Sequence, residues 1–361
     1  MRTLLVATFV DFWRDGSGHR SRIRVLLEFL QSRINITIFF AGIVSDADMI
    51  LLGRDFPKIR IQSASKEPRL TFKDYIESFK IFIRNKKFDF AIVEYIELTG
   101  ILEFLPDETT TLLDVHDLVF QKMESFRKCG VAYDGIELTR QEELNIFDCY
   151  DYVILIQKED LEIVSKFMSL DRLVLAPHPV RAKKMNIRKK ARNVGYVASS
   201  YIANIEALRW FMDNVWKKIL AKNQVFLNIY GNIKYNFLPS GNRFVENTIF
   251  HGFIDHLETI YSNSDIIVNP VRCGAGLKIK NVEALGNGLP LVTTTHGAAG
   301  LGHNALECLL IADEPYEYAN AFNMLLRNYQ FRKRLAKKAF EFAVEHFSDR
   351  KCYKGLVDII C

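Results

Sequence analysis

The sequence predicts an α/β protein built from two doubly wound domains. The chain has 361 residues, its composition is that of an ordinary globular protein, with 49% hydrophobic and 25% charged residues, and strand-like apolar runs alternate with helical stretches from end to end. Such a βαβ rhythm indicates parallel sheets covered by helices. Because ligands of these folds bind outside the carboxyl ends of the strands, we expect two facing domains that enclose a central cleft.

The first half of the chain contains regularly spaced apolar runs. We expect its strands at 3–9, 34–40, 90–93, 111–115, 152–156 and 173–175. The rhythm then breaks at 176–180, where two prolines precede a basic run and favour a connector over a strand. We therefore assign 1–180 to an N-terminal domain and 181–192 to a linker.

The same rhythm restarts after the linker. Strands are expected at 193–197, 225–230, 248–251 and 266–269, a helix over 205–220, and a helical pattern over 316–346. We assign 193–345 to a C-terminal domain. Residues 346–361 form a C-terminal tail, for which a return to the N-terminal domain is one option.

Several classes of protein are excluded by composition. The sequence has no run of about 18 apolar residues, and charges at 11–15 follow the first strand too soon for a signal peptide, so we expect no membrane span. Six cysteines without a CxxC pair favour a reducing cytoplasm over a zinc site or disulfide framework. The net charge of +5 is mild. The basic run at 181–192 is either a solvated linker or a surface for an anionic membrane, and no nucleic acid is expected.

The most informative segment is 269–292. A strand ending at Pro270 leads into a turn with Gly274, Ala275 and Gly276, and a helix is expected to begin near Leu277. Glycines let the main chain approach a ligand, and the N–H groups at a helix start favour an anion. The pattern predicts a phosphate site, although an ordinary strand, turn and helix with a solvated basic face would look the same.

Three charged residues of this helix suit a nucleoside diphosphate. Lys278 and Lys280 add positive charge opposite a diphosphate, and Glu283 can accept hydrogen bonds from a ribose diol. The two lysines are candidates for the stabilisation of a leaving diphosphate, so we also name them as catalytic residues.

A second glycine-containing loop follows the first strand. Gly16 and Gly18 allow this loop to lie close to a ligand, and Arg20 or Arg22 could pair with phosphate. A plain turn between a strand and a helix is the alternative.

Two further candidates stand at strand ends. His116 follows an apolar strand and precedes Asp117; it is either a structural histidine or a residue of the sugar pocket. Asn204 follows the strand 193–197. We expect it first of all to cap the next helix, with a contact to the donor as the alternative.

The segment 274–292 resembles the nucleotide-sugar site of family 4 retaining glycosyltransferases, which have two Rossmann-like domains in the arrangement called GT-B. It fits the pattern G-x-G-x-[RK]-x-K-x-x-E-A-x-x-x-G-x-P-x-V at every fixed position. The resemblance implies that Lys278 and Lys280 hold the donor diphosphate and that Glu283 holds the ribose. The commoner pattern has a second acid eight residues before that glutamate, where this chain has Ala275. Contacts to the sugar would then come from the main chain of the turn.

The same resemblance extends more loosely to the other candidates. It implies that 1–180 is the acceptor side and that 193–345 binds the nucleotide sugar. It also implies that the loop with Gly16, Gly18 and Arg20 contacts the donor, that His116 lines the sugar pocket, and that the loop before Asn204 belongs to the donor site.

The expected function is retaining transfer of a sugar from a nucleoside diphosphate sugar to a hydroxyl of a glycan or lipid-linked glycan, in bacterial surface polysaccharide synthesis. No metal and no cofactor are expected, since the sequence shows no carboxylate pair or His/Cys cluster suited to a metal and two lysines can neutralise the leaving group. The expected location is the cytoplasm, at the inner face of the membrane as one option. A nucleotide-sugar epimerase and a non-catalytic sugar-binding subunit of the same fold are the alternatives.

Overall fold

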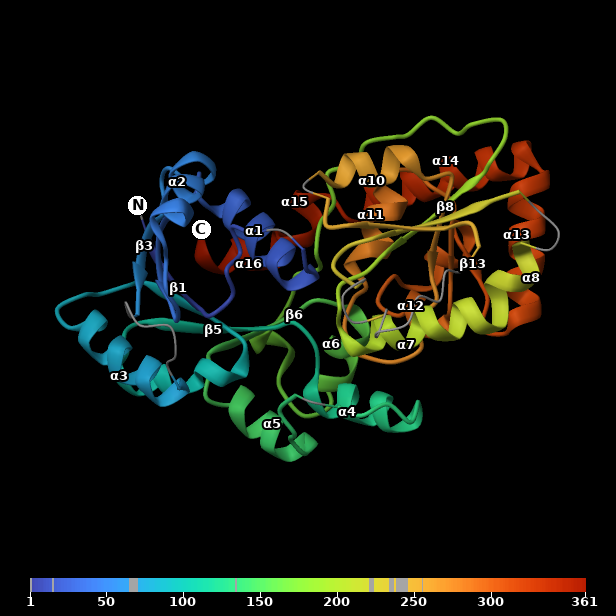
Figure 1. Cartoon of the computed structure of the whole chain (residues 1–361). Helices are drawn as coiled ribbons and strands as arrows, with labels where there is room; N and C mark the ends of the chain where they lie inside the picture. The colour runs from blue at the N-terminus through green and yellow to red at the C-terminus, as the bar shows by residue number, and fades with distance from the viewer. Residues whose placement is uncertain are drawn as a thin grey trace. The chain divides into compact units, whose positions relative to one another are not determined.

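The computed structural model describes residues 2–14, 16–64, 71–133, 135–220, 224–233, 237, 246–254 and 256–361. The chain divides into two compact units, which Figure 1 shows with their helices and strands. The first unit consists of Met1–Phe120, Glu137–Pro177 and Tyr353–Cys361. The second consists of Gln121–Ile136 and His178–Cys352.

The first unit is built on a seven-stranded parallel sheet of order β3-β2-β1-β4-β5-β6-β7. Its strands are β1 (Thr3–Thr8), β2 (Asn35–Phe40), β3 (Arg60–Ser63), β4 (Phe90–Glu94), β5 (Thr110–Val115), β6 (Tyr152–Leu155) and β7 (Leu173–Leu175). Its helices are α1 (Gly18–Leu30), α2 (Asp46–Asp55), α3 (Phe72–Ile83), η1 (Ile96–Phe104), the start of α4 (Val119–Lys128), α5 (Arg140–Phe147), α6 (Lys158–Val164), η2 (Leu170–Arg172) and α16 (Lys354–Ile360). The strand order reverses between β1 and β4, so the carboxyl ends of these two strands mark the expected ligand position.

The second unit is built on a six-stranded parallel sheet of order β10-β9-β8-β11-β12-β13. Its strands are β8 (Asn193–Val197), β9 (Phe226–Tyr230), β10 (Thr248–Gly252), β11 (Ile266–Asn269), β12 (Leu291–Thr293) and β13 (Leu310–Ile311). Its helices, besides most of α4, are α7 (Ile202–Phe211), η3 (Met212–Trp216), α8 (Lys217–Leu220), α10 (Leu257–Asn263), α11 (Ile279–Gly286), α12 (Thr295–Ala298), η4 (His303–Glu307), α13 (Pro315–Arg327), α14 (Tyr329–His346) and α15 (Asp349–Cys352). Here the order reverses between β8 and β11.

Both sheets are covered by helices on both faces, as continuous apolar strands require. In the second unit, α7, η3 and α13 pack on one face through a core that includes Leu208, Trp216 and Phe322. Figure 1 shows α10, α11 and α14 on the other face. The predicted α/β class with two doubly wound, parallel sheets is therefore confirmed.

Several element boundaries differ from the prediction. The helix expected over 205–220 begins at Ile202, and the pattern over 316–346 is two helices separated at Asn328, whose side chain accepts a hydrogen bond from the N–H of Phe331 and starts α14. Strands β3, β12 and β13 were not predicted. They have between two and four residues, so a period-2 pattern marks them only weakly.

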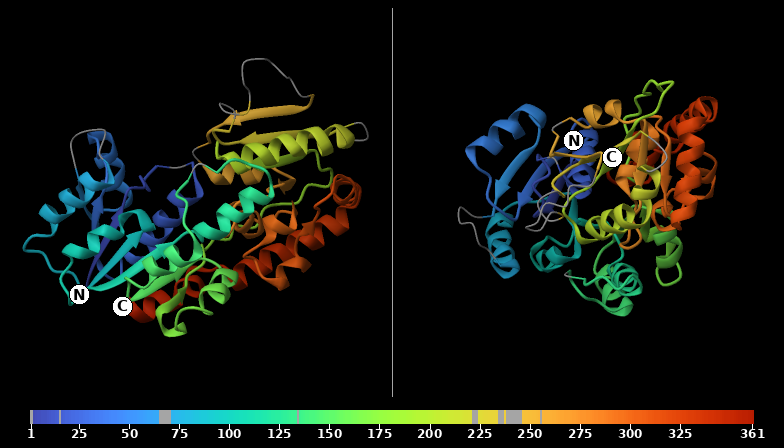
Figure 2. Two further views of the ribbon diagram at one scale, coloured as in Figure 1. Left: turned by 90° about the horizontal axis from the view of Figure 1, so that it is seen from below. Right: turned by 45° about the vertical axis from the view of Figure 1, so that its right-hand side comes forward.

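Two segments belong to a different unit from the residues next to them in the sequence. Residues 121–136, assigned above to the N-terminal domain, cluster with the second unit because Phe126 is buried against Ala203 and Cys273. From Tyr353 onward the tail clusters with the first unit. The ring of Tyr353 lies 5.0 Å from that of Phe29, and α16 lies beside α1 in Figure 1 and Figure 2.

The expected linker is held against the second unit by its main chain. The N–H groups of Lys183 and Met185 donate to the carbonyls of Gly286 and Asn287. Part of its charge is paired within the chain, since Arg188 contacts Asp265 at 2.8 Å. Over the described ranges, no helix combines the length and apolar character needed to cross a membrane.

Candidate active site

The turn after β11 is shaped by two glycines and a buried amide pair. Gly274 and Gly276 have φ values of +110° and +68°, which side chains with a Cβ rarely adopt. Below the turn, the Asn269 amide donates to Oδ1 of Asn281 at 2.9 Å, and Asn281 donates to the carbonyl of Gly297 at 2.7 Å. These bonds fix the end of β11 to the start of α11, which begins at Ile279 and not at the expected Leu277.

Lys278 closes this turn from the N-cap position of α11. Its Nζ donates to the carbonyl oxygens of Ala275 at 3.2 Å and Gly276 at 2.8 Å. The ammonium group therefore lies at the turn that the sequence singled out, next to the positive end of the α11 dipole. The turn and Lys278 together bring positive charge to the N-terminus of α11.

Lys280 lies two residues further along the chain, in the first turn of α11. Its Nζ donates to Oδ1 of Asn204 at 2.7 Å and lies 5.1 Å from the ring centre of Tyr196. Burial, together with the neighbouring charge of Lys278, lowers the pKa of Lys280 to about 7. A bound anion would favour the protonated form and raise this pKa again.

Asn204 does not cap the helix that follows β8, so the expectation of an N-cap was wrong. Helix α7 starts at Ile202 with Tyr201 in the N-cap position, which leaves Asn204 inside the first turn. Its amide instead donates to the carbonyl of Ser199 at 3.2 Å while its oxygen accepts from Lys280. Asn204 thus joins the loop after β8 to the helix after β11.

Glu283 is buried on α11, and its carboxylate meets a residue that the sequence analysis missed. The hydroxyl of Tyr261 on α10 donates to Oε2 of Glu283 at 2.6 Å. Burial raises the pKa of Glu283 to about 7, while the Tyr261 hydrogen bond and the charge of Lys280 act in the opposite direction. The sequence carried no signal for Tyr261 beyond its place in a short amphipathic helix.

His296, at the start of α12, is a second missed residue beside the turn. Burial and the charge of Lys278 lower its pKa to about 4, although main-chain groups of Cys273 and Gly274 act to raise it. The imidazole is therefore neutral at physiological pH. It could have been noticed only as a histidine directly after the segment 274–292.

The glycine loop of the first unit contains Gly16, with φ +111°, and Gly18, the first residue of α1. Arg20 forms a two-point ion pair with Asp11 at 2.6 and 2.7 Å. Arg22, named above as an alternative phosphate partner, is fully buried and donates to both carboxylate oxygens of Asp114. That part of the expectation was wrong, because the side chain of Arg22 points into the core.

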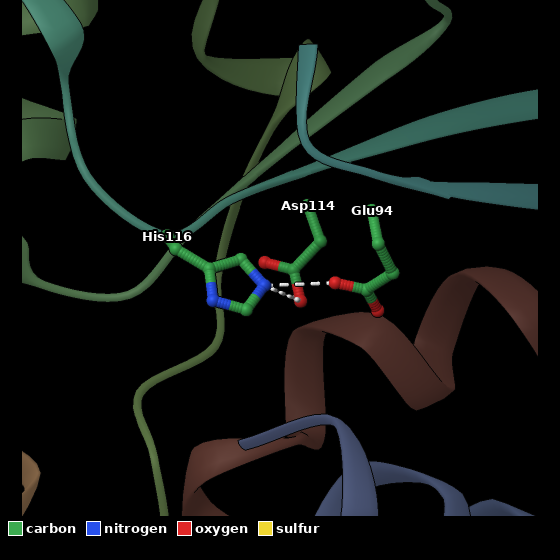
Figure 3. Close-up of side chains that lie close together, drawn as sticks. All are labelled: Glu94, Asp114 and His116. Atoms are coloured by element: carbon green, nitrogen blue, oxygen red, sulfur yellow. Dashed lines mark hydrogen bonds and ion pairs between the residues drawn. The ribbon is translucent and has the colours of Figure 1, made fainter. Parts of the chain in front are cut away.

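His116 lies at the carboxyl end of β5 in a buried polar cluster, shown in Figure 3. Its Nε2 lies 2.8 Å from Oε2 of Glu94, the last residue of β4, and its Nδ1 lies 3.1 Å from the hydroxyl of Tyr95. The Tyr95 ring stacks on the imidazole at 4.1 Å, and Tyr95 itself has φ +71° and ψ 150°, a region that is essentially restricted to glycine. Both ring nitrogens of His116 therefore have partners within the first unit.

Glu94, Asp114 and His116 each offer one possible metal-ligand atom, and these atoms lie within 4.8 Å of one another. However, Arg22 already neutralises Asp114 through bonds of 2.6 and 3.1 Å. Burial, followed by the charge of Asp114, raises the pKa of Glu94. Oε2 of Glu94 is in turn bonded to His116, so the three groups already have partners within the chain.

The candidate residues thus fall into two groups. Asn204, Gly274, Ala275, Gly276, Lys278, Lys280 and Glu283 lie in the second unit, at the ends of β8 and β11. Gly16, Gly18, Arg20 and His116 lie in the first unit, at the ends of β1 and β5.

Part of the second unit matches a known protein family. Residues 191–328 match the family model of the glycosyl transferases group 1. A relative from Klebsiella pneumoniae, described as an uncharacterized 44.6 kDa protein in the cps region, is 24% identical over 373 residues, which cover 94% of this chain and 95% of that protein.

Two solved structures extend the likeness over the whole chain. Sucrose-phosphate synthase from Thermosynechococcus elongatus has a TM-score of 0.74 at 16% identity, covering 99% of this chain and 98% of its own. A mutant of S. aureus TarM in complex with Fondaparinux, alpha-GlcNAc-glycerol and UDP has a TM-score of 0.76 at 9% identity, covering 100% of both chains. The fold is therefore GT-B, and the comparisons support a glycosyltransferase.

Proposed function

We propose that this protein is a family 4 retaining glycosyltransferase that moves a sugar from a nucleoside diphosphate sugar to a hydroxyl of a glycan or lipid-linked glycan. The observation that carries the proposal is the arrangement of Lys278, Lys280 and Glu283 around the start of α11, within the segment that matches the group 1 glycosyltransferase family. Cations and a helix N-terminus suit a diphosphate, and a carboxylate suits a ribose diol.

In the proposed complex, the diphosphate lies against the turn 274–276 and the N-terminus of α11. Lys278 would exchange its bonds to the carbonyls of Ala275 and Gly276 for phosphate oxygens. Lys280 would be held in place by Asn204 and become fully protonated. Glu283, oriented by Tyr261, would accept the ribose hydroxyls.

The proposed reaction breaks the bond between the anomeric carbon and the diphosphate oxygen and forms a bond from that carbon to the acceptor oxygen on the same face. The acceptor's proton passes to an oxygen of the leaving diphosphate. Lys278, Lys280 and the helix dipole stabilise the negative charge that develops there. Because Ala275 stands where the commoner pattern has an acid, the sugar is proposed to be held by main-chain groups of the turn.

His116 is proposed to face the sugar from the end of β5. With Nε2 near Glu94 and Nδ1 near Tyr95, its contribution would come from position and polarity, since neither ring nitrogen is left to take the acceptor's proton. The loop with Gly16, Gly18 and Arg20 is proposed to contact the donor from the first unit.

The proposed reaction uses no metal and no cofactor, because the two lysines supply the positive charge at the leaving group. The proposed setting is surface polysaccharide synthesis at the cytoplasmic face of the membrane. The relative described from a cps region supports that setting. Lys189, Lys190 and Arg192 are exposed in the basic run and would provide the peripheral contact with anionic lipid.

The proposal is tested by incubating the protein with a panel of nucleoside diphosphate sugars, with and without lipid-linked glycan acceptors. The expected result is acceptor-dependent release of the nucleoside diphosphate, with the anomeric configuration retained and the rate unchanged by EDTA. Conversion of the donor to a different sugar without acceptor would indicate an epimerase. Binding of donor without any turnover would indicate a non-catalytic subunit, and activity lost with EDTA and restored by Mg²⁺ would overturn the metal-free reaction.

A further inference from the structure

Residues 121–136 pack in the second unit against both of its proposed donor-binding loops, although they precede β6 in the chain. The first consists of the loop after β8 with Tyr201 and the start of α7 with Ala203, and the second follows β11 and includes Arg272 to Gly276. The contacts come from one side of α4 and from the residues directly after it.

The first contact reaches the main chain of the donor turn. The N–H of Gly274 donates to the hydroxyl oxygen of Ser125 at 3.1 Å. Gly274 has φ +110°, a conformation that a glycine can also leave easily because no Cβ restricts it. The Ser125 hydroxyl therefore restrains a peptide group whose φ no Cβ fixes.

The second contact is apolar and lies next to the first. The ring of Phe126 is fully buried in one cluster with Ala203 and Cys273, so it touches both loops at once. The thiol of Cys129 donates to the carbonyl of Arg272 at 3.1 Å, which restrains the turn one residue further upstream.

The opposite side of α4 carries exposed residues. Glu124 and Lys128 are exposed and pair with each other at 2.8 Å, four residues apart on the helix surface. They have no hydrogen bond or ion pair with the donor loops among those described for the second unit. The helix therefore has one face that supports the turn and one that faces solvent.

We propose that Ser125 and Phe126 are positioning residues that hold the turn 272–276 in the shape that receives the donor diphosphate. This inference rests on the proposed function and deepens it. A turn that is ordered before binding spares the ligand the entropic cost of ordering it. Loss of the Ser125 contact should therefore weaken donor binding and raise KM while it leaves kcat nearly unchanged.

The test compares Ser125→Ala with Ser125→Thr, which restores the hydroxyl, and with Glu124→Ala on the exposed face. Affinity is measured by calorimetry with UDP, GDP, ADP and dTDP. Ser125→Ala is expected to bind the preferred nucleotide about five-fold more weakly, while Ser125→Thr and Glu124→Ala keep affinity within about two-fold. Phe126→Leu should weaken binding in the same direction.

Amide hydrogen exchange of the peptide covering 272–276 gives a readout that needs no nucleotide. This peptide should exchange faster in Ser125→Ala than in wild type, with no change in Glu124→Ala. Wild-type affinity together with wild-type exchange in Ser125→Ala would overturn the inference. If the wild-type protein binds none of the four nucleotides, the proposed function loses its support, and the exchange comparison still decides whether Ser125 restrains the turn.

Discussion

The phenolic hydroxyl of Tyr261 donates a 2.6 Å hydrogen bond to Oε2 of Glu283, and both side chains are buried. The bond favours the charged carboxylate, whereas burial favours its protonated form and raises the pKa to about 7. Tyr261 therefore controls how much of Glu283 is ionised at neutral pH. Only the ionised form provides the full acceptor strength that the proposed ribose contact needs.

Tyr261→Phe should make nucleotide binding depend more steeply on pH. Without the hydroxyl, the pKa of Glu283 rises further above about 7, so UDP affinity at pH 7 should fall about five-fold and recover towards pH 9. Calorimetric titrations from pH 6 to 9 measure this shift. Tyr316→Phe, at an exposed tyrosine of the same unit, is the control. Equal loss of affinity at every pH would contradict the explanation.

Glu283→Gln should weaken donor binding and increase the stability of the folded protein at pH 8. The pKa is 4.5 in the unfolded chain and about 7 in the folded protein, so folding favours the protonated form, and stability falls as pH rises from 4.5 to 7. Above pH 7 the ionised, buried carboxylate costs about 3 kcal/mol. The glutamine variant should therefore unfold at higher denaturant concentration than wild type at pH 8, and at the same concentration at pH 4, while it binds UDP more weakly. Glu341→Gln, at an exposed site, should change neither property.

Because the pKa of Lys280 is lowered, we expect the protein to take up a proton when a nucleotide binds. The pKa of about 7 leaves Lys280 largely neutral at pH 8, and a diphosphate would return it to the charged form. The binding enthalpy of UDP at pH 8 is measured in two buffers with different ionisation enthalpies. The two values should differ by about the difference between those ionisation enthalpies, because roughly one proton is taken up. The difference should vanish in Lys280→Met and persist in Lys217→Met, an exposed lysine. Identical enthalpies in both buffers for the wild-type protein would refute the coupling.

Arg22→Met should strongly destabilise the first unit. The guanidinium is buried, bonds both oxygens of Asp114 and donates to the carbonyl of Ala176. Its removal leaves a buried carboxylate without its cation, at a cost of about 3 to 5 kcal/mol. Denaturant unfolding monitored by fluorescence measures this. Arg54→Met, which removes an exposed ion pair with Asp55, should cost less than about 1 kcal/mol, and a similar small loss in Arg22→Met would disprove the role of the buried pair.

His116→Ala should lower both stability and turnover but leave nucleotide affinity unchanged. The variant leaves Glu94 and the Tyr95 hydroxyl without their partner, which costs about 1 to 3 kcal/mol. In the proposed complex His116 faces the sugar and not the nucleotide, so calorimetry with UDP should give the wild-type value. A variant that melts earlier yet keeps full specific activity at low temperature would show that His116 has only a structural role.

The sequence by itself determined the α/β class, the two parallel sheets and the segment 274–292. Apolar runs in a βαβ rhythm have few ways to pack, and the glycines, lysines and glutamate of that segment are close together in the chain. Their local spacing on one turn and one helix therefore fixes much of their geometry. Short strands such as β3 have few residues, so their sequence pattern is weak.

Only the tertiary structure decided which distant side chains complete the site. Tyr261 reaches Glu283 across 22 positions, Lys280 reaches Asn204 across 76, and Gly274 reaches Ser125 across 149. The partners of the two arginines after Gly18 were also decided by the tertiary structure. Neither spacing nor composition indicates that Arg20 pairs with Asp11 while Arg22 enters the core. Such contacts depend on how helices pack on the sheets, and burial, not residue type, then sets the pKa values near 7 of Lys280 and Glu283.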